Sequence, residues 1–177
     1  MRKPPRVLIL WGVPGTGKST FAKYLVENHG YAHIDTDAGG AGDSRAAKAW
    51  QAVLNGTGTP EEFVKLARYD PQPVVMEYGL FANDQGIGLL GRLRKAGAEA
   101  WWFDGDRKAA FRAWQDENAK ARPDFVDPMW HNVVAVIDAN YASLEAFFGT
   151  KMVRTIEAGP VHSAPEETFN AMFRDNS

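Results

Sequence analysis

The 177-residue sequence contains no cysteine, which excludes disulfide bonds and metal sites built on thiolates. It also lacks any apolar run near the roughly 20 residues that a membrane-spanning helix needs. Residues 1–5 lead directly into a predicted strand instead of the apolar core of a signal peptide. We therefore expect a cytoplasmic protein with no membrane partner.

An excess of charge of either sign is also missing. Lys and Arg total 20 and Asp and Glu total 22, so the net charge is -2. A domain without overall positive charge has no general attraction to polyanions, which argues against long nucleic acid as a partner. Internal repeats, low-complexity segments and a dividing linker are absent too, so we expect one domain over residues 1–177. The sequence carries no signal for oligomeric state.

The most informative stretch is residues 12–19, which match the phosphate-loop pattern G-x-x-x-x-G-K-[S/T]. Apolar residues 7–11 before it predict a strand, and residues 20–26 after it have a helical pattern. The alternative is a Gly-rich turn without a ligand, but a chance match in a chain of this length has odds on the order of 1%. The stretch therefore predicts a loop that binds a polyphosphate.

Each part of this loop has an expected role. Its glycines let consecutive backbone N–H groups turn inward, and the first turn of the next helix adds the positive end of its dipole. Lys18 is expected to reach the outer phosphates, and the Ser19 hydroxyl to complete the coordination of Mg²⁺. The predicted nucleotide-binding residues are Gly12, Val13, Pro14, Gly15, Thr16, Gly17, Lys18, Ser19 and Thr20.

Acidic residues follow two of the predicted strands. Asp35 and Asp37 come after a short second strand, and Glu77 ends an apolar third strand. Ligands of an open parallel sheet bind at the carboxyl ends of its strands, so these acids are expected to face the same crevice as the phosphate loop. Glu77 is a candidate metal ligand with Ser19, as in a Walker B arrangement. The alternatives are a turn cap, a solvated Asp and an ordinary ion pair of Glu77.

Basic residues gather in residues 107–128, where two prolines interrupt a helical pattern. A loop flanked by basic residues between two helices can close over a nucleotide as a lid. Arg107 and Arg122 are candidates to neutralise charge in the transition state, and Arg112 is a candidate nucleotide contact. The alternative for each is an exposed helix cation. After this segment we expect a single helix over residues 129–147 with one apolar side.

The acceptor is expected to bind over residues 38–70, which include two predicted helices between the second and third strands. Arg45 and Arg68 are candidate anion contacts there, although exposed helical arginines are usually only solvated. Tyr78 and Gly79, directly after the third strand, are further candidate substrate contacts. At the other side of the site, residues 157–160 follow the fifth strand and are placed to touch an adenine.

Five predicted strands alternating with helices, a phosphate loop after the first, acids after the second and a basic Pro-containing segment after the fourth resemble the small P-loop kinases. The shikimate and gluconate kinases are the nearest likeness, and adenylate kinase is more distant. The resemblance implies an α/β fold with a three-layer, doubly wound, five-stranded parallel sheet and a small lid. It also implies ATP and Mg²⁺ as cofactors, with Asp35 at the metal and Asp37 as the base that meets the acceptor hydroxyl.

The resemblance does not extend to the residues that bind the acceptor. Residues 77–80 read Glu-Tyr-Gly-Leu where shikimate kinases carry a glycine triplet, and residues 39–44 replace the His-Asn-Lys segment of gluconate kinases. Neither substrate can therefore be transferred to this chain. We expect transfer of the γ-phosphoryl group of ATP to a hydroxyl of an unidentified small molecule.

Other functions stay open at this point. A nucleotide or polynucleotide 5′-hydroxyl kinase is possible because Trp50, Tyr78 and Phe81 offer aromatic surfaces for stacking. An antibiotic-modifying phosphotransferase is equally compatible. A different class is a nucleotide-binding regulatory switch that hydrolyses its ligand slowly.

Overall fold

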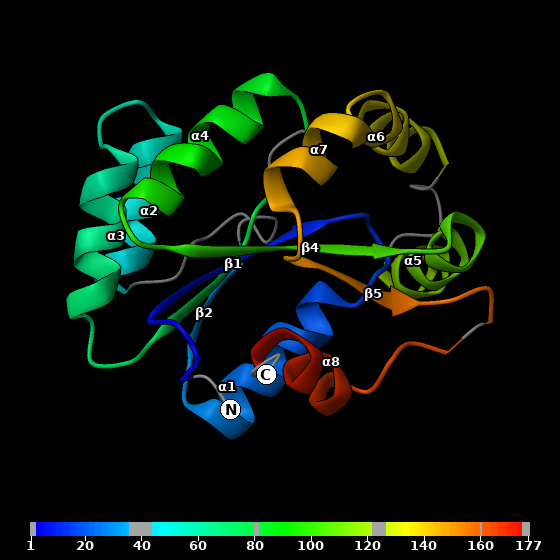
Figure 1. The fold of residues 1–177 in the computed structure, drawn as a ribbon, viewed down its shortest axis with the longest axis horizontal. Coiled ribbons are helices and arrows are strands. Elements are labelled where there is room, and N and C mark those ends of the chain that lie inside the picture. Colours follow the sequence, from blue (N-terminus) through cyan, green and yellow to red (C-terminus); the bar gives the residue numbers. More distant parts are fainter. Residues whose placement is uncertain (1–2, 36–43, 80–81, 122–126, 160, 175–177) are drawn as a thin grey trace.

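The computed structural model describes residues 3–35, 44–79, 82–121, 127–159 and 161–174. At its centre is a five-stranded sheet of order β2-β3-β1-β4-β5, in which all neighbouring strands are parallel (Figure 1). The strands are β1 (Val7–Gly12), β2 (Ala32–Asp35), β3 (Val74–Glu77), β4 (Glu99–Gly105) and β5 (Met152–Ile156). The predicted α/β class with a five-stranded parallel sheet is confirmed.

Helices connect the strands and cover both faces of the sheet (Figure 1). One face carries α1 (Lys18–His29) and α8 (Pro165–Phe173). The other packs against α2 (Arg45–Leu54), α3 (Pro60–Tyr69), α4 (Asp84–Lys95), α5 (Arg107–Ala121), α6 (Asp127–Ala139) and α7 (Tyr141–Phe148). In the described part of the chain, no helix has both the length and the apolar character needed to cross a bilayer.

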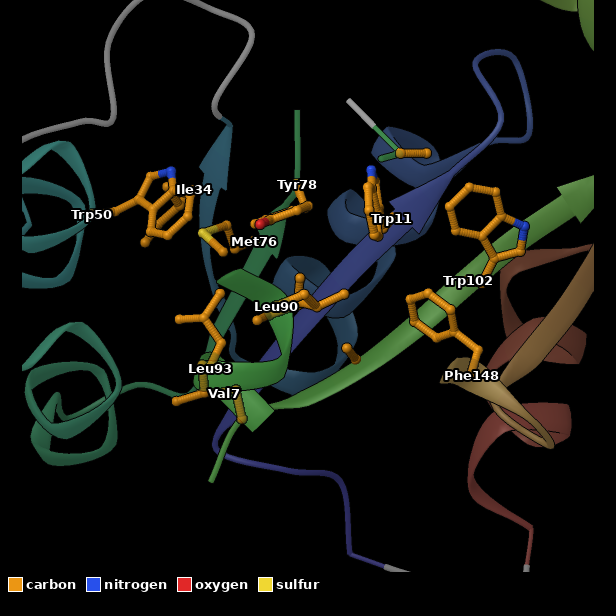
Figure 2. Close-up of a cluster of buried hydrophobic side chains, with 14 of the residues drawn as sticks. Val7, Trp11, Ile34, Trp50, Met76, Tyr78, Leu90, Leu93, Trp102 and Phe148 are labelled. Atoms are coloured by element: carbon orange, nitrogen blue, oxygen red, sulfur yellow. The ribbon is translucent and has the colours of Figure 1, made fainter. Parts of the chain in front are cut away.

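Strand β1 is apolar throughout because both faces of the sheet are covered. Its successive side chains point to opposite faces: Leu10 joins the cluster beneath α1 and α8, and Trp11 joins the cluster on the other face. Figure 2 shows this second cluster, where the Trp11 ring lies edge-on to Tyr78 and Trp102, with ring centroids 5.0 Å and 5.4 Å apart. The sheet is therefore a rigid base for the loops at its ends.

The prediction of a single helix over residues 129–147 is wrong. Asn140 separates α6 from α7, and its side-chain Nδ2 donates to the Val136 carbonyl oxygen at 2.8 Å. A side-chain amide that bonds a nearby carbonyl competes with the regular helical bonds. The apolar side of the segment is nevertheless in the core as predicted, through Trp130, Val133, Val134, Ile137, Tyr141, Leu144 and Phe148.

The start of α5 follows the sequence rules for helix caps. Asp106 caps this helix by accepting a hydrogen bond from the Ala109 backbone N–H at 2.9 Å. Asp104 is the sixth residue of β4, which extends to Gly105. This strand brings the acid to the same edge of the sheet as the phosphate loop.

Candidate functional site

The phosphate loop runs from Gly12 at the end of β1 to Lys18 at the start of α1. Gly15 and Gly17 have φ values of 82° and 79°, in the left-handed region that favours glycine. At Gly15 there is also no space for a side chain, because a Cβ there would lie 2.0 Å from the Ala110 carbonyl oxygen of α5. Both glycines are therefore required by backbone conformation, and Gly15 is also required by packing against α5.

Two side chains of the loop bond to its own backbone. Lys18 Nζ donates to the carbonyl oxygens of Val13 at 2.9 Å and Gly12 at 3.3 Å. The buried Thr16 donates through Oγ1 to the Val13 carbonyl at 2.7 Å. The Lys18 ammonium therefore lies against the loop to which the sequence assigns the phosphates.

Glu77, at the end of β3, connects the start of α1 to β2. Its Oε2 accepts a hydrogen bond from Ser19 Oγ at 2.9 Å, and its Oε1 lies 2.9 Å from Nε2 of His33. Burial raises the pKa of this carboxyl, but hydrogen bonds with His33 and Ser19 and the charge of Lys18 outweigh it and hold the pKa below its usual value. The site therefore presents an ionised, buried carboxylate next to the Ser19 hydroxyl.

A hydroxyl and a carboxylate beside a phosphate loop fit Mg²⁺, which takes oxygen ligands and fills its remaining positions with water and substrate phosphates. Two of the three predicted metal ligands, Ser19 and Glu77, are in direct contact. Asp35 stands opposite Glu77 in the β2–β3 register, and its side chain lies outside the described part. No group of three or more His, Cys, Asp or Glu side chains forms a metal site among the described residues.

Sequence reasoning missed His33, which it treated only as part of a buried strand. The side chain is 20% exposed and bonds to Glu77 from the neighbouring strand. The sequence did contain a signal for this role. The spacing of two residues puts His33 on the same face of β2 as Asp35, a predicted site residue. His33 is therefore a further residue of the site, acting on the carboxylate of Glu77.

The acid at the end of β4 has different partners. Asp104 accepts a hydrogen bond from Arg107 Nη1 at 2.6 Å and another from the Tyr141 hydroxyl at 2.7 Å. Burial raises the pKa of Asp104, but the bonds from Arg107 and Tyr141 hold it below its usual value. Arg107 also pairs with Asp138 at 3.2 Å. The structure thus places Arg107, a predicted catalytic residue, in an ion-pair cluster between α5 and α6.

The structure also locates the predicted acceptor contacts. Tyr78 is 2% exposed, and its hydroxyl donates to the Gly86 carbonyl at 3.0 Å, so its side chain belongs to the core and not to an acceptor surface. Gly79 and Arg45 are exposed. Arg68 is exposed near the opposite edge of the sheet, where its carbonyl accepts a bond from Arg6, the residue before β1.

Of the remaining predicted site residues, the structure describes Arg112 and Thr20. Arg112 is exposed on α5, and Thr20 is exposed in the first turn of α1. Asp37 and Arg122 lie outside the described residues. The structure therefore brings together the loop, Ser19 and Glu77 from the predicted set.

A pocket of about 190 Å³ lies beside the phosphate loop. Gly17 and Thr20 form one side of it, and His162, between β5 and α8, and Pro165, the first residue of α8, form the other. Residues 157–159, which belong to the segment expected to touch an adenine, are not among the lining residues of this pocket. The pocket adjoins the phosphate loop on the side of α8.

No family model matches the sequence. The adenylate kinase of Natronomonas pharaonis is 36% identical over 86 residues, which cover 49% of this chain and 38% of that protein. UMP-CMP kinase 3 of Arabidopsis thaliana is 33% identical over 75 residues, covering 42% of this chain and 34% of that protein. The match therefore spans less than two fifths of the length of either relative.

The fold has a solved counterpart. A gluconokinase from Sinorhizobium meliloti 1021 aligns over 97% of this chain and 91% of its own, with a TM-score of 0.54 at 14% identity. At this identity the likeness concerns the fold alone. Together with the two sequence relatives, it confirms the predicted resemblance to the small P-loop kinases and the predicted fold.

Proposed function

We propose that this protein is a kinase that uses Mg²⁺ and ATP to phosphorylate a hydroxyl of a small molecule. The observation that carries the proposal is the group formed by Lys18, Ser19 and Glu77. It puts an ammonium, a hydroxyl and an ionised carboxylate together at the phosphate loop. The names of the two sequence relatives, both nucleotide kinases, support phosphoryl transfer.

Phosphoryl transfer needs positioning and charge neutralisation more than covalent chemistry. The N–H groups of the loop and the start of α1 would bind the phosphates, with the nucleoside in the pocket beside Gly17. Lys18 would neutralise the outer phosphates. Ser19 and Glu77, with Asp35, would hold Mg²⁺, which would supply positive charge to the phosphates. His33 would keep the Glu77 carboxylate in place.

The acceptor side of the proposal rests on Asp37, Arg45 and Gly79. We propose Asp37 as the base that orients the acceptor hydroxyl, and residues 107–128 as a lid whose Arg112 and Arg122 reach phosphate. A positioned base contributes about 10²- to 10⁴-fold, so Asp37→Ala should lower kcat by about that factor while ATP affinity stays near wild type. Full kcat with the true acceptor would remove Asp37 from this role.

A nucleoside monophosphate is the second candidate acceptor. The two sequence relatives are an adenylate kinase and a UMP-CMP kinase. In this case the γ-phosphoryl group would pass to a phosphate oxygen instead of a hydroxyl, and the donor half of the site would be unchanged.

The test is a coupled assay of ADP release over metabolites, nucleosides, nucleoside monophosphates and aminoglycoside-like compounds. We expect release that depends on one acceptor class and is abolished by Lys18→Ala, with full activity in Lys23→Ala as the matched control on the exposed side of α1. Release at the same rate without any acceptor would favour a slow hydrolase. Activity retained by Lys18→Ala would remove the phosphate-loop assignment.

A further inference from the structure

Three consecutive carbonyls of the phosphate loop accept hydrogen bonds from side chains in the C-terminal part of the chain. The donors come from α6, from the segment after β5 and from β5 itself. The bonds are Trp130 Nε1 to Pro14 at 3.4 Å, His162 Nε2 to Gly15 at 2.8 Å and Thr155 Oγ1 to Thr16 at 2.6 Å.

These bonds determine where the loop's N–H groups point. In a planar trans peptide, the C=O of one residue and the N–H of the next point in opposite directions. A donor that holds the Gly15 carbonyl therefore turns the Thr16 N–H away from itself. In the same way, the bond from Thr155 to the Thr16 carbonyl turns the Gly17 N–H away from Thr155. The side chains that bond to these carbonyls therefore orient the N–H groups of the loop. An anion site of this type depends on those N–H groups.

His162 is the most exposed of these donors and has its own supports. Its ring packs on Gly17, where a Cβ would lie 3.2 Å from His162 Cδ2. Its backbone forms an antiparallel bridge with Ile156, and the next residue, Ser163, donates its N–H to the Thr155 carbonyl at 2.7 Å. Because a carbonyl only accepts, His162 Nε2 carries the proton in this contact.

We propose that His162 is a positioning residue of the phosphate loop. Its Nε2–H holds the Gly15 carbonyl so that the Thr16 N–H faces the bound polyphosphate. The same ring lines the pocket beside the loop, so it joins the nucleoside side of the site to the phosphate side. The inference rests on the proposed function, since both concern one nucleotide site.

The test compares two ligands, ATP and inorganic tripolyphosphate, which has no base. Calorimetry would measure both with wild type, with His162→Phe, which keeps a ring without a donor, and with His162→Gln, which restores an amide donor. Loss of one hydrogen bond predicts that His162→Phe binds both ligands about 5- to 10-fold more weakly, and that His162→Gln recovers most of the loss. Val161→Ala, at an exposed neighbour, should bind as wild type.

The outcomes separate the possible roles of the ring. Weaker binding of ATP with unchanged binding of tripolyphosphate would show that His162 contacts only the nucleoside, and would overturn the positioning role. Unchanged binding of both ligands by His162→Phe would overturn it as well. A wild-type protein that binds neither ligand would overturn the proposed function together with this inference. If thermal melting shows that His162→Phe does not fold, His162→Ala is measured in its place, with the same expectations.

Discussion

Two buried carboxylates lie at the carboxyl ends of the strands on either side of β1, and they differ in what holds them. Glu77 on β3 and Asp104 on β4 are each 6% exposed, and both have pKa values below their usual range. Glu77 is bonded by the hydroxyl of Ser19 and the imidazole of His33. Asp104 is bonded by the guanidinium of Arg107 and by a tyrosine hydroxyl.

The difference lies in which partners a ligand can replace. A hydroxyl can turn from a carboxylate to a cation while keeping its place on the helix. A buried carboxylate paired with arginine is costly to break, by about 3–5 kcal/mol, because the remaining charge is left without compensation. Glu77 therefore has the surroundings of a ligand, and Asp104 those of a structural ion pair. Glu77 and Asp104 both lie at the end of a strand, so their positions do not distinguish them. The chemistry of their hydrogen-bond partners does.

The largest effect that we expect is on stability, from Asp104→Ala. Removing this acid leaves the partly buried Arg107 with the exposed Asp138 as its ion-pair partner and should lower the free energy of unfolding by about 3 kcal/mol. Chemical denaturation measures the change. Asp116→Ala, at an exposed position of α5, is the control and should change stability by less than about 0.5 kcal/mol. Lost activity at unchanged stability would put Asp104 in the functional site and remove the distinction.

The second effect is on activity, from Glu77→Gln. The amide keeps the size of the side chain but removes the charge, so we expect kcat/KM to fall about 10- to 100-fold with a higher Mg²⁺ requirement. Titration of the rate with Mg²⁺ measures this, and Glu27→Gln on the exposed side of α1 is the control. If the variant loses stability and keeps its Mg²⁺ dependence, Glu77 is structural like Asp104.

A smaller effect on stability is expected from Tyr141→Phe. Burial and the bond to Asp104 raise the pKa of Tyr141 to about 12, so its hydroxyl stays protonated and donates. Losing this bond should lower the free energy of unfolding by about 1 kcal/mol, as measured by denaturation. Tyr69→Phe is the control because Tyr69 is 79% exposed. Equal stability of both variants would mean that Arg107 alone holds the carboxylate.

The smallest effect is a difference between pH profiles. The pKa of Asp104 in the folded protein is below its usual value of 3.8. Its contribution to stability is therefore complete above pH 3.8 and is lost as the pH falls through the lower folded pKa. In denaturation at several pH values, Asp104→Asn should be less stable than wild type near neutrality. The difference in free energy of unfolding between the two proteins should become smaller in acid. Parallel profiles would contradict an ionised Asp104 in the native state.

Much of the fold was predictable because its signals are local. Apolar runs alternating with helical patterns indicated the parallel sheet. The helix over residues 129–147 was predicted as one piece because its apolar spacing continues across Asn140. The break depends on the hydrogen bond of that side chain to Val136, which apolar periodicity does not report.

The candidate site also has one part that the sequence predicted and another part that it did not. The positions of Gly15 and Gly17 follow from backbone conformations that glycine adopts and other residues avoid, so eight consecutive residues were enough to predict the loop. The contacts of Glu77 were not readable, since Ser19 and His33 lie 58 and 44 residues away along the chain. Tyr78 also looked accessible until packing against α4 placed it in the core.

Local chemistry thus identified the phosphate loop, because its glycines adopt backbone conformations that other residues avoid. The roles of the acids at the strand ends were decided only when distant segments came together. Arg107 and Tyr141 hold Asp104 in an ion-pair cluster, whereas a hydroxyl and an imidazole hold Glu77 beside the loop. The physical reason is that a buried carboxylate is stable only with partners, and the fold determines which partners reach it.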